Sequence, residues 1–174
     1  MAFNVNEIRA NLIGDGARPS LFEVEMTNPA STSGDAVLRY MVRAAQIPQS
    51  TINPIEVPYF GRRIKLAGSR TYANWTVTVM NDENFAVRSA LEAWSSQINS
   101  GQTNLRTLSA YRSTASVKQF AKDGSVLRIY DFVNIFPLDI GPIALAWDDG
   151  DNVETFDVEF AYDYWNVNDN SIVR

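Results

Sequence analysis

The chain has 174 residues, a length that suits one domain and needs no disulfide or metal to hold the fold together. It contains no cysteine and no histidine, which excludes disulfides, thiolate chemistry, zinc-finger and iron–sulfur sites, and the commonest general base. Its 20 acidic and 15 basic residues give a net charge of −5, which argues against a protein that binds duplex phosphates. The composition therefore favours a protein that is not an enzyme and that has no cofactor.

The sequence also carries no targeting signal that we recognise. Its N-terminus lacks the basic and apolar regions of a signal peptide. The longest apolar run, over residues 136–147, is interrupted by two prolines, a glycine and an aspartate, so it is not expected to span a bilayer. We expect a protein that is made and folded in a cytoplasm and has no membrane partner.

The first third of the chain alternates between short elements and loops. Residues 4–13 have apolar side chains at helical spacing and predict a short helix, which needs a partner surface for stability. Period-two alternation predicts a strand over residues 20–27. A loop over 28–35 follows, then a strand over 36–44 that could pair with the first. The three prolines of residues 46–59 predict an extended loop or an edge segment.

The middle of the chain contains the most regular patterns. Residues 62–66 and 71–80 predict two strands of a hairpin around residues 67–70. Residues 84–99 predict an amphipathic helix that packs on the core, and Gly101 is placed to end it. The apolar stripe of this helix consists of Val87, Leu91, Trp94 and Ile98.

The last third is rich in alternating patterns. Residues 114–120 and 125–133 flank an Asp-Gly pair and predict a hairpin. The next predicted strand alternates Ile143, Leu145 and Trp147. A turn over residues 148–152 leads into a strand over 153–165, which has the best alternation in the chain.

About eight strands with antiparallel hairpins and one helix predict a mostly β fold. We expect a β-barrel or two-sheet sandwich with one packed α-helix, α+β by strict count. Residues 1–174 are expected to form a single domain. Residues 1–18 are a separate N-terminal segment, and the polar tail over residues 166–174 is expected to become ordered on contact with a partner.

An acidic cluster is the best candidate for a cation site, and the pattern does not support it. The cluster consists of Asp148, Asp149, Asp151 and Glu154. Calcium loops place a glycine at the sixth position, whereas Gly150 is the third residue here. Adjacent turn residues also do not make the paired carboxylates of a glycosidase. We expect a solvated turn, with no metal site and no catalytic residue.

A basic group is the best candidate for a contact surface. It consists of Arg62, Arg63, Lys65 and Arg70. Alternation puts Arg63 and Lys65 on one strand face and Arg62 on the other, which splits the patch. Nucleic-acid binding, an exposed solvated face and pairing with a neighbouring subunit are all compatible with it. We favour the third interpretation, and suspect that these four residues make inter-subunit contacts.

Several aromatic residues could form a platform that stacks on sugars. They are Trp75, Trp94, Trp147, Tyr162 and Tyr164. Because they lie within alternating strands and the stripe of the predicted helix, we interpret them as core residues.

The remaining features favour assembly. Long strands with polar outer faces leave unpaired edges that a monomer must cover. The proline-rich residues 46–59 and the two termini are the segments best placed to reach a neighbour. Contacts between different faces of successive subunits close a ring or extend a filament.

A block of mixed chemistry lies at the predicted junction between a strand and the helix. Residues 75–83 read Trp-Thr-Val-Thr-Val-Met-Asn-Asp-Glu. This block resembles the tail-tube proteins of contractile-tailed (T4-like) bacteriophages, and the stretch over residues 61–83 is the strongest part of the resemblance. Further similar positions are residues 17–25, Leu145, Trp147, Asp148, Phe156, Val158, Asp163, Tyr164 and Trp165. The loops over 28–35 and 101–114 do not match the family pattern, nor does the tail after Trp165.

The resemblance implies a structural subunit of the virion tail, assembled in the host cytoplasm. It implies hexameric rings that stack into a hollow tube, in which strands from six subunits form a continuous inner barrel. The implied partners are the tail sheath, the baseplate or tube initiator, and the tape-measure protein. DNA would pass through the lumen without specific binding, which suits subunits that each carry a charge of −5.

Two other functions remain open. Type VI secretion and extracellular contractile injection systems contain related tubes, and neighbouring genes for a capsid and a terminase would indicate a phage. A carboxylate hydrolase or carbohydrate-binding β-sandwich is the alternative from another class. A hydrolase requires two carboxylates that converge in a cleft.

Overall fold

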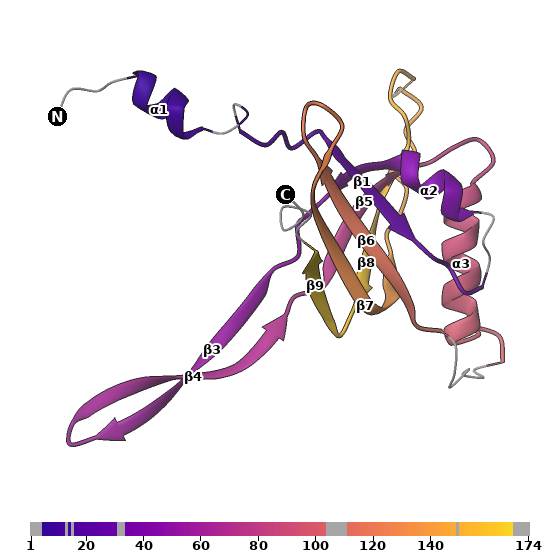
Figure 1. The fold of residues 1–174 in the computed structure, drawn as a ribbon. Helices are drawn as coiled ribbons and strands as arrows, with labels where there is room; N and C mark the ends of the chain where they lie inside the picture. The colour runs from indigo at the N-terminus through magenta and orange to yellow at the C-terminus, as the bar shows by residue number, and fades with distance from the viewer. Residues whose placement is uncertain are drawn as a thin grey trace.

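Antiparallel strands form the body of the molecule, and one long strand connects its two halves (Figure 1). The computed structural model describes residues 5–12, 14, 16–30, 34–103, 111–148 and 150–168. The helices in this part of the chain are α1 (Val5–Asn11), α2 (Asp35–Met41) and α3 (Ala86–Ile98). The strands are β1 (Phe22–Met26), β2 (Val42–Ala45), β3 (Ser50–Tyr59), β4 (Arg62–Tyr72), β5 (Trp75–Met80), β6 (Ser113–Phe120), β7 (Val126–Ile140), β8 (Thr155–Ala161) and β9 (Tyr164–Asn168). The predicted mostly β class is confirmed, and among the helices of the described ranges α2 is the one that was not predicted.

Strand β7 changes partners halfway along its length. The seven-stranded sheet has the order β1-β6-β7-β8-β5-β2, and β9 also pairs with β7. The first half of β7 pairs with β6 and β9, and the second half pairs with β8. Asn134 lies at this change, with a φ of 59° and its Nδ2 donating to Asp163 Oδ2 over 2.6 Å. Asparagine tolerates this left-handed geometry, so a bulge here lets β7 turn between the two halves.

The two halves of the sheet share one apolar core. Trp75 of β5 packs against Phe132 of β7 and Phe160 of β8, with ring centroids 4.4 and 5.7 Å apart. The other buried residues include Val24, Val77, Val117, Ile135 and Val158. The alternation predicted for residues 20–27 is therefore confirmed as burial on one face. The alternation predicted for residues 71–80 is confirmed only from Trp75 on, because Ala73 is exposed.

Helix α3 confirms the predicted amphipathic helix. Its stripe is buried at Val87, Leu91 and Trp94 and partly buried at Ile98. The helix packs against β7 and α2, and both helices lie at one side of the sheets in Figure 1. Asp82 Oδ1 accepts the backbone N–H of Ala86 over 3.0 Å at the start of the helix, which satisfies a free donor there.

Residues 36–44 do not form the predicted strand. The chain instead makes helix α2 and then the short strand β2, which pairs with β5 rather than with β1. Leu38 is buried, and Val37 and Met41 pack against the core. Spacings of three and four residues put these side chains on one face of a helix, so a helix buries them better than a strand.

The predicted hairpin of residues 62–66 and 71–80 is also wrong. β4 runs without a turn through residues 67–70 and pairs with β3, whereas β5 pairs with β8 and β2. Gly68 does not mark a turn. It lets the two strands approach closely, because a Cβ there would lie 2.5 Å from the carbonyl oxygen of Asn53.

The Asp-Gly hairpin is confirmed, and the strand predicted after it is wrong. β6 and β7 pair around Gly124, which has a φ of 84°. β7 continues through Pro137 to Ile140, because this proline lies beside a register shift that relaxes the ladder. Leu145 and Trp147 then lie exposed in the β7–β8 connection (residues 141–154), not in a strand.

Residues 153–165 form two strands instead of one. β8 and β9 are separated by Tyr162 and Asp163, and the core face of β8 is buried as expected. β9 includes residues 166–168, whereas residues 169–174 lie outside the described part of the chain.

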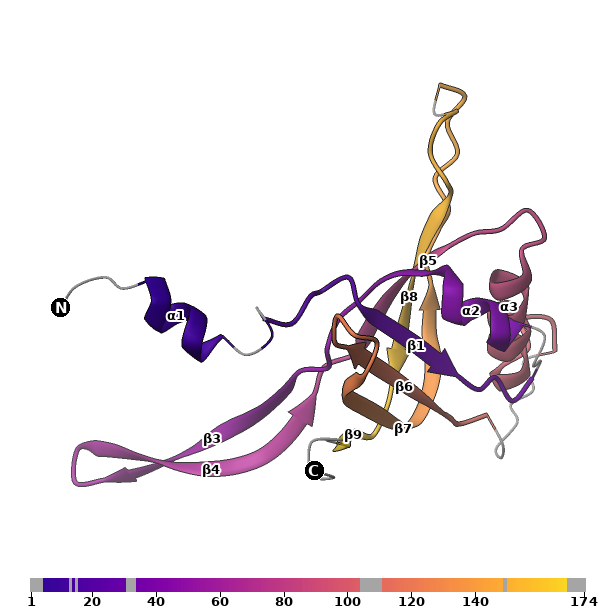
Figure 2. The same cartoon turned by 45° about the horizontal axis from the view of Figure 1, so that its top comes forward.

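The predicted N-terminal helix is confirmed as α1, and it lies apart from the sheets in Figures 1 and 2. Its Ile8 and the following Leu12 are exposed. Among the residues described, no helix is both long and apolar enough to cross a membrane.

Candidate assembly surface

The β3–β4 hairpin is a two-stranded ribbon that extends away from the body of the molecule (Figures 1 and 2). Its strands pair in register from Ser50↔Tyr72 to Tyr59↔Arg62, with a shift near Asn53. An isolated two-stranded hairpin is only marginally stable in water. A ribbon of this length therefore needs a surface to pack against.

One face of the hairpin is apolar and the other is charged. Paired residues share a face, so the register gathers Ile55, Val57, Tyr59, Ile64 and Leu66 on the same side. All five are exposed, between 40% and 61%. On the opposite face, Arg63 Nη1 lies 2.9 Å from Glu56 Oε2. An exposed apolar patch rimmed by charges is typical of a protein–protein contact.

The structure places all four predicted contact residues on β4. Arg63 and Lys65 lie on the charged face, and Arg62 lies on the apolar face beside the tip, as the alternation predicted. Arg70 is opposite Ile52, closer to the body. These positions are exposed, and the group is divided between two faces and two ends of the ribbon.

The tip of the hairpin is an aromatic feature that our sequence reasoning missed. Phe60 and Gly61 both have positive φ, 44° and 76°, as in the tight turns of hairpins whose loop has two residues. The Phe60 ring is 90% exposed and packs edge-on against Tyr59, with ring centroids 4.6 Å apart. The Phe-Gly pair after an alternating run was the available signal for this turn.

The root of the hairpin is fixed to the core by aromatic residues. Trp75 Nε1 donates to the carbonyl oxygen of Gln46 over 2.8 Å. Tyr72 packs near Tyr162 and Trp165, with ring centroids 6.0 and 6.4 Å apart. Burial raises the pKa of Tyr162 because the phenolate would be poorly solvated. The hairpin therefore leaves the body from a rigid base.

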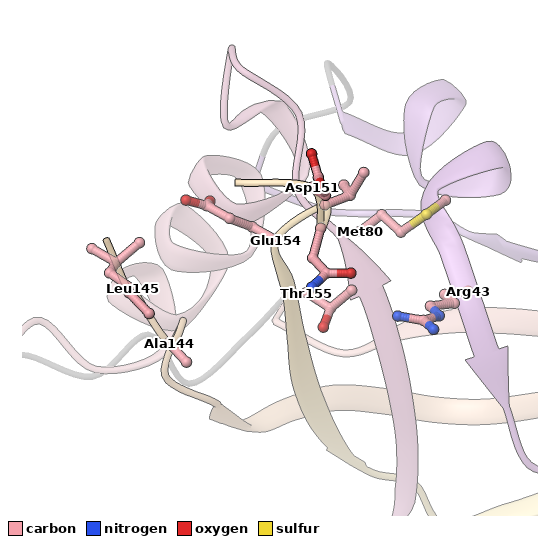
Figure 3. A pocket seen from close by; sticks show the side chains of 10 residues that line it. Arg43, Met80, Ala144, Leu145, Asp151, Glu154 and Thr155 are labelled. Atoms are coloured by element: carbon pink, nitrogen blue, oxygen red, sulfur yellow. The ribbon is translucent and has the colours of Figure 1, made fainter. Parts of the chain in front are cut away.

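The β7–β8 connection is a second projection, which Figure 2 shows at the top of the molecule. Leu145, Trp147 and Val153 are its exposed apolar side chains. At its base lies a cavity of about 580 Å³, lined by residues that include Arg43, Met80, Leu145, Asp151 and Glu154 (Figure 3).

The predicted acidic cluster lies on this connection. No group of acidic side chains in the described ranges could hold a metal ion, and Asp149 lies outside those ranges. Glu154 Oε2 accepts the Nδ2 of Asn81 over 3.0 Å, so this carboxylate also supports the fold. Asp148 and Asp151 are exposed, in agreement with the expected solvated turn.

The core interpretation of the aromatic residues is confirmed for part of the set. Trp75 and Trp94 are buried, and Tyr162 packs partly buried against the core. It is wrong for Trp147, which is fully exposed on the β7–β8 connection, and for Tyr164, which is exposed on β9. Alternation predicts a shared face, but it does not reveal whether anything covers that face.

The outer faces of the sheet are polar and mostly acidic. Thr78 of β5 donates to Asp157 of β8 over 2.6 Å, and Asn74, just before β5, donates to Glu159 of β8 over 2.8 Å. On β1 and β6, Lys118 Nζ lies 2.6 Å from Glu25 Oε2. The hydrogen bond from Lys118 lowers the pKa of Glu25, because it stabilises the carboxylate.

Comparisons with known proteins find similarity in sequence and in fold. A family described as "Phage tail tube protein" matches residues 17–168. The tail tube protein gp19 of Enterobacteria phage T4 is 35% identical over 161 residues, which cover 90% of this chain and 95% of that protein.

Two solved structures share the fold. One is a sheath–tube complex of an extracellular contractile injection system, with a TM-score of 0.63, 11% identity, and coverage of 97% of this chain and 99% of that one. The other is the tube-terminating cap of the anti-feeding prophage, with a TM-score of 0.64, 15% identity, and coverage of 88% and 91%.

Proposed function

Because this chain belongs to the phage tail tube protein family, we propose that its copies form hexameric rings that stack into the inner tube of a contractile tail. The family is structural, so the chain is a component of the virion tail and not an enzyme. The observation that carries the proposal is the match to the T4 tail tube protein over nearly the whole of both chains.

The β3–β4 hairpin supports this proposal. Its apolar face has nothing in its own subunit to cover it among the described residues, and it extends beyond the sheets. Contacts between unlike surfaces of successive subunits generate rings or filaments. We assign Arg62, Arg63, Lys65 and Arg70 to these inter-subunit contacts, because all four lie exposed on β4.

A tube also requires partners along and inside it. Of the two similar structures, one is a complex of a sheath and a tube, and the other is a cap that terminates a tube. For this chain we propose a sheath outside the tube, a baseplate or tube initiator at one end, and a tape-measure protein in the lumen before DNA.

The charge of the subunit suits a conduit for DNA. Asp139 and Glu159 are neighbours in the sheet register, and the same outer face carries Asp157. Retained phosphate contacts would add salt-dependent affinity and slow the passage of DNA. A net charge of −5 on each copy avoids such contacts.

The tube of an injection machine is the second candidate, since both similar structures come from phage-like contractile systems. The sequence identity is 35% to the T4 protein and at most 15% to those two, which favours a phage tail. A capsid gene and a terminase gene beside this gene are expected. Genes for protein toxins in their place would favour the injection machine.

The proposal is tested by electron microscopy of the purified protein in negative stain, seeded with tail baseplates if necessary. Hollow tubes of uniform width are expected in the seeded samples. A protein that stays monomeric beside its baseplate would contradict the proposal.

A further inference from the structure

The conformation of Phe60 is unusual for its position. Positive φ at the first central residue of a tight hairpin turn normally selects glycine, asparagine or aspartate, whereas a bulky residue there is strained. The ring of this strained residue lies at the far end of the hairpin, where it is 90% exposed. Strained residues of this kind concentrate at binding and functional sites. Phe60 therefore has the character of an anchor residue.

The cavity beside the β7–β8 connection has the complementary chemistry. Its volume of about 580 Å³ lies in the range of pockets that enclose small ligands or side chains. Met80, Leu145 and Val153 supply apolar walls, and Asp151 and Glu154 supply carboxylates. Figure 3 shows Arg43 and Leu145 on opposite sides of these carboxylates. The cavity contains two carboxylates and one guanidinium, so its charge is suited to an aromatic ring that has a positively charged neighbour.

The tip of the hairpin supplies both groups. Arg62 and Arg63 follow the turn directly, one on each face of the ribbon. Figures 1 and 2 show the hairpin and the β7–β8 connection leaving the body at separate places and in different directions. A subunit therefore cannot fill its own cavity with its own tip, whereas a second copy stacked on it can.

We infer that Phe60 of one subunit docks in the β7–β8 cavity of a second copy of this chain, with Arg62 facing Asp151 and Glu154. This inference rests on the proposed tube and names one of its contacts. Because the two surfaces differ, the contact is head-to-tail and repeats from copy to copy. A buried aromatic anchor flanked by charged pairs is the usual composition of an interface hot spot.

The absence of cysteine in the natural chain permits a direct test by crosslinking. The F60C/L145C double variant, assembled and treated with a short bis-maleimide, is expected to give a ladder of dimers, trimers and longer products. Each single variant is expected to remain uncrosslinked. A dimer from F60C alone would mean that hairpins meet each other, which contradicts the inference. Tubes of the double variant that give no crosslinked ladder would also contradict the inference.

A second test does not depend on the crosslinker. Phe60→Ala is expected to raise the concentration needed for tube growth about tenfold, as loss of a hot-spot residue does. Arg62→Glu and Asp151→Arg should each impair growth, and the combined variant should restore it, because the charges of this pair are then exchanged. Unchanged growth of F60A, or no rescue by the exchange, would overturn the docking. Absence of tubes from the unaltered protein would instead overturn the proposed function.

Discussion

Trp75 donates its indole N–H to the backbone carbonyl of Gln46 over 2.8 Å, where the chain leaves β2 for the hairpin. Trp75 is buried in the core, so this bond connects the first residue of β5 to the root of the ribbon. The direction of the hairpin therefore depends on a core residue, and core packing and assembly are coupled at this position.

Trp75→Phe should destabilise the subunit by about 1–3 kcal/mol, because the partly buried carbonyl of Gln46 loses its donor. Urea unfolding measures the loss, and proteolysis should cut the loosened hairpin faster. Trp147→Phe is the matched control, since Trp147 is fully exposed. Equal effects of the two substitutions would show that the bond does not matter.

Leu91→Asp should unfold the subunit, because it places a carboxylate in the apolar stripe of α3, where Leu91 is 2% exposed. Ala93→Asp introduces the same residue on the exposed side of the helix and should leave the melting temperature nearly unchanged. Circular dichroism during heating distinguishes the two. A wild-type melting temperature for Leu91→Asp would mean that α3 does not pack as described.

The pair of Glu25 and Lys118 should make stability depend on pH. Its hydrogen bond lowers the pKa of Glu25 in the folded state below the unfolded value of about 4.3. The pair therefore contributes stability above that value, and the contribution is lost as pH falls through the folded pKa. Glu25→Gln should lower the melting temperature at neutral pH, and the difference from the unaltered protein should shrink in acid. A difference that is constant across this range would contradict the assignment.

Arg62→Glu combined with Arg63→Glu should impair tube elongation without unfolding the subunit, because both side chains are exposed on the hairpin. Arg18→Glu with Lys122→Glu changes the net charge equally at exposed positions outside the hairpin and serves as the control. Tube lengths in electron micrographs and unfolding curves of the monomer provide the two readouts. Normal tube lengths in the hairpin variant would refute an inter-subunit role for these arginines.

Local patterns predicted the elements whose partners are close in sequence. The stripe from Val87 to Trp94 identified α3, and the Asp-Gly pair identified the β6–β7 hairpin, since both depend on neighbouring residues. The resemblance to a family carried the function, because a tube subunit has no reactive residues for a motif to reveal. The alternation of side chains along a strand also predicted correctly that Arg62 and Arg63 lie on different faces.

The errors arose where tertiary partners decide the structure. Gly68 is a residue type common in turns, but pairing with β3 keeps it in an extended strand. The alternation of Leu145 and Trp147 suggested a buried strand, although no part of the described subunit covers them. Both residues, like the apolar face of the hairpin, have side chains that a monomer leaves exposed. A single sequence does not distinguish a face that covers its own core from a face that meets a neighbour.

The claim that this subunit builds a hollow tube is tested most directly by electron cryomicroscopy of assembled protein viewed end-on. Six-fold averages with an open centre are expected, with the β3–β4 hairpin of each subunit packed against another copy. Particles without rotational symmetry, or rings in which the hairpin projects freely into solvent, would contradict the account.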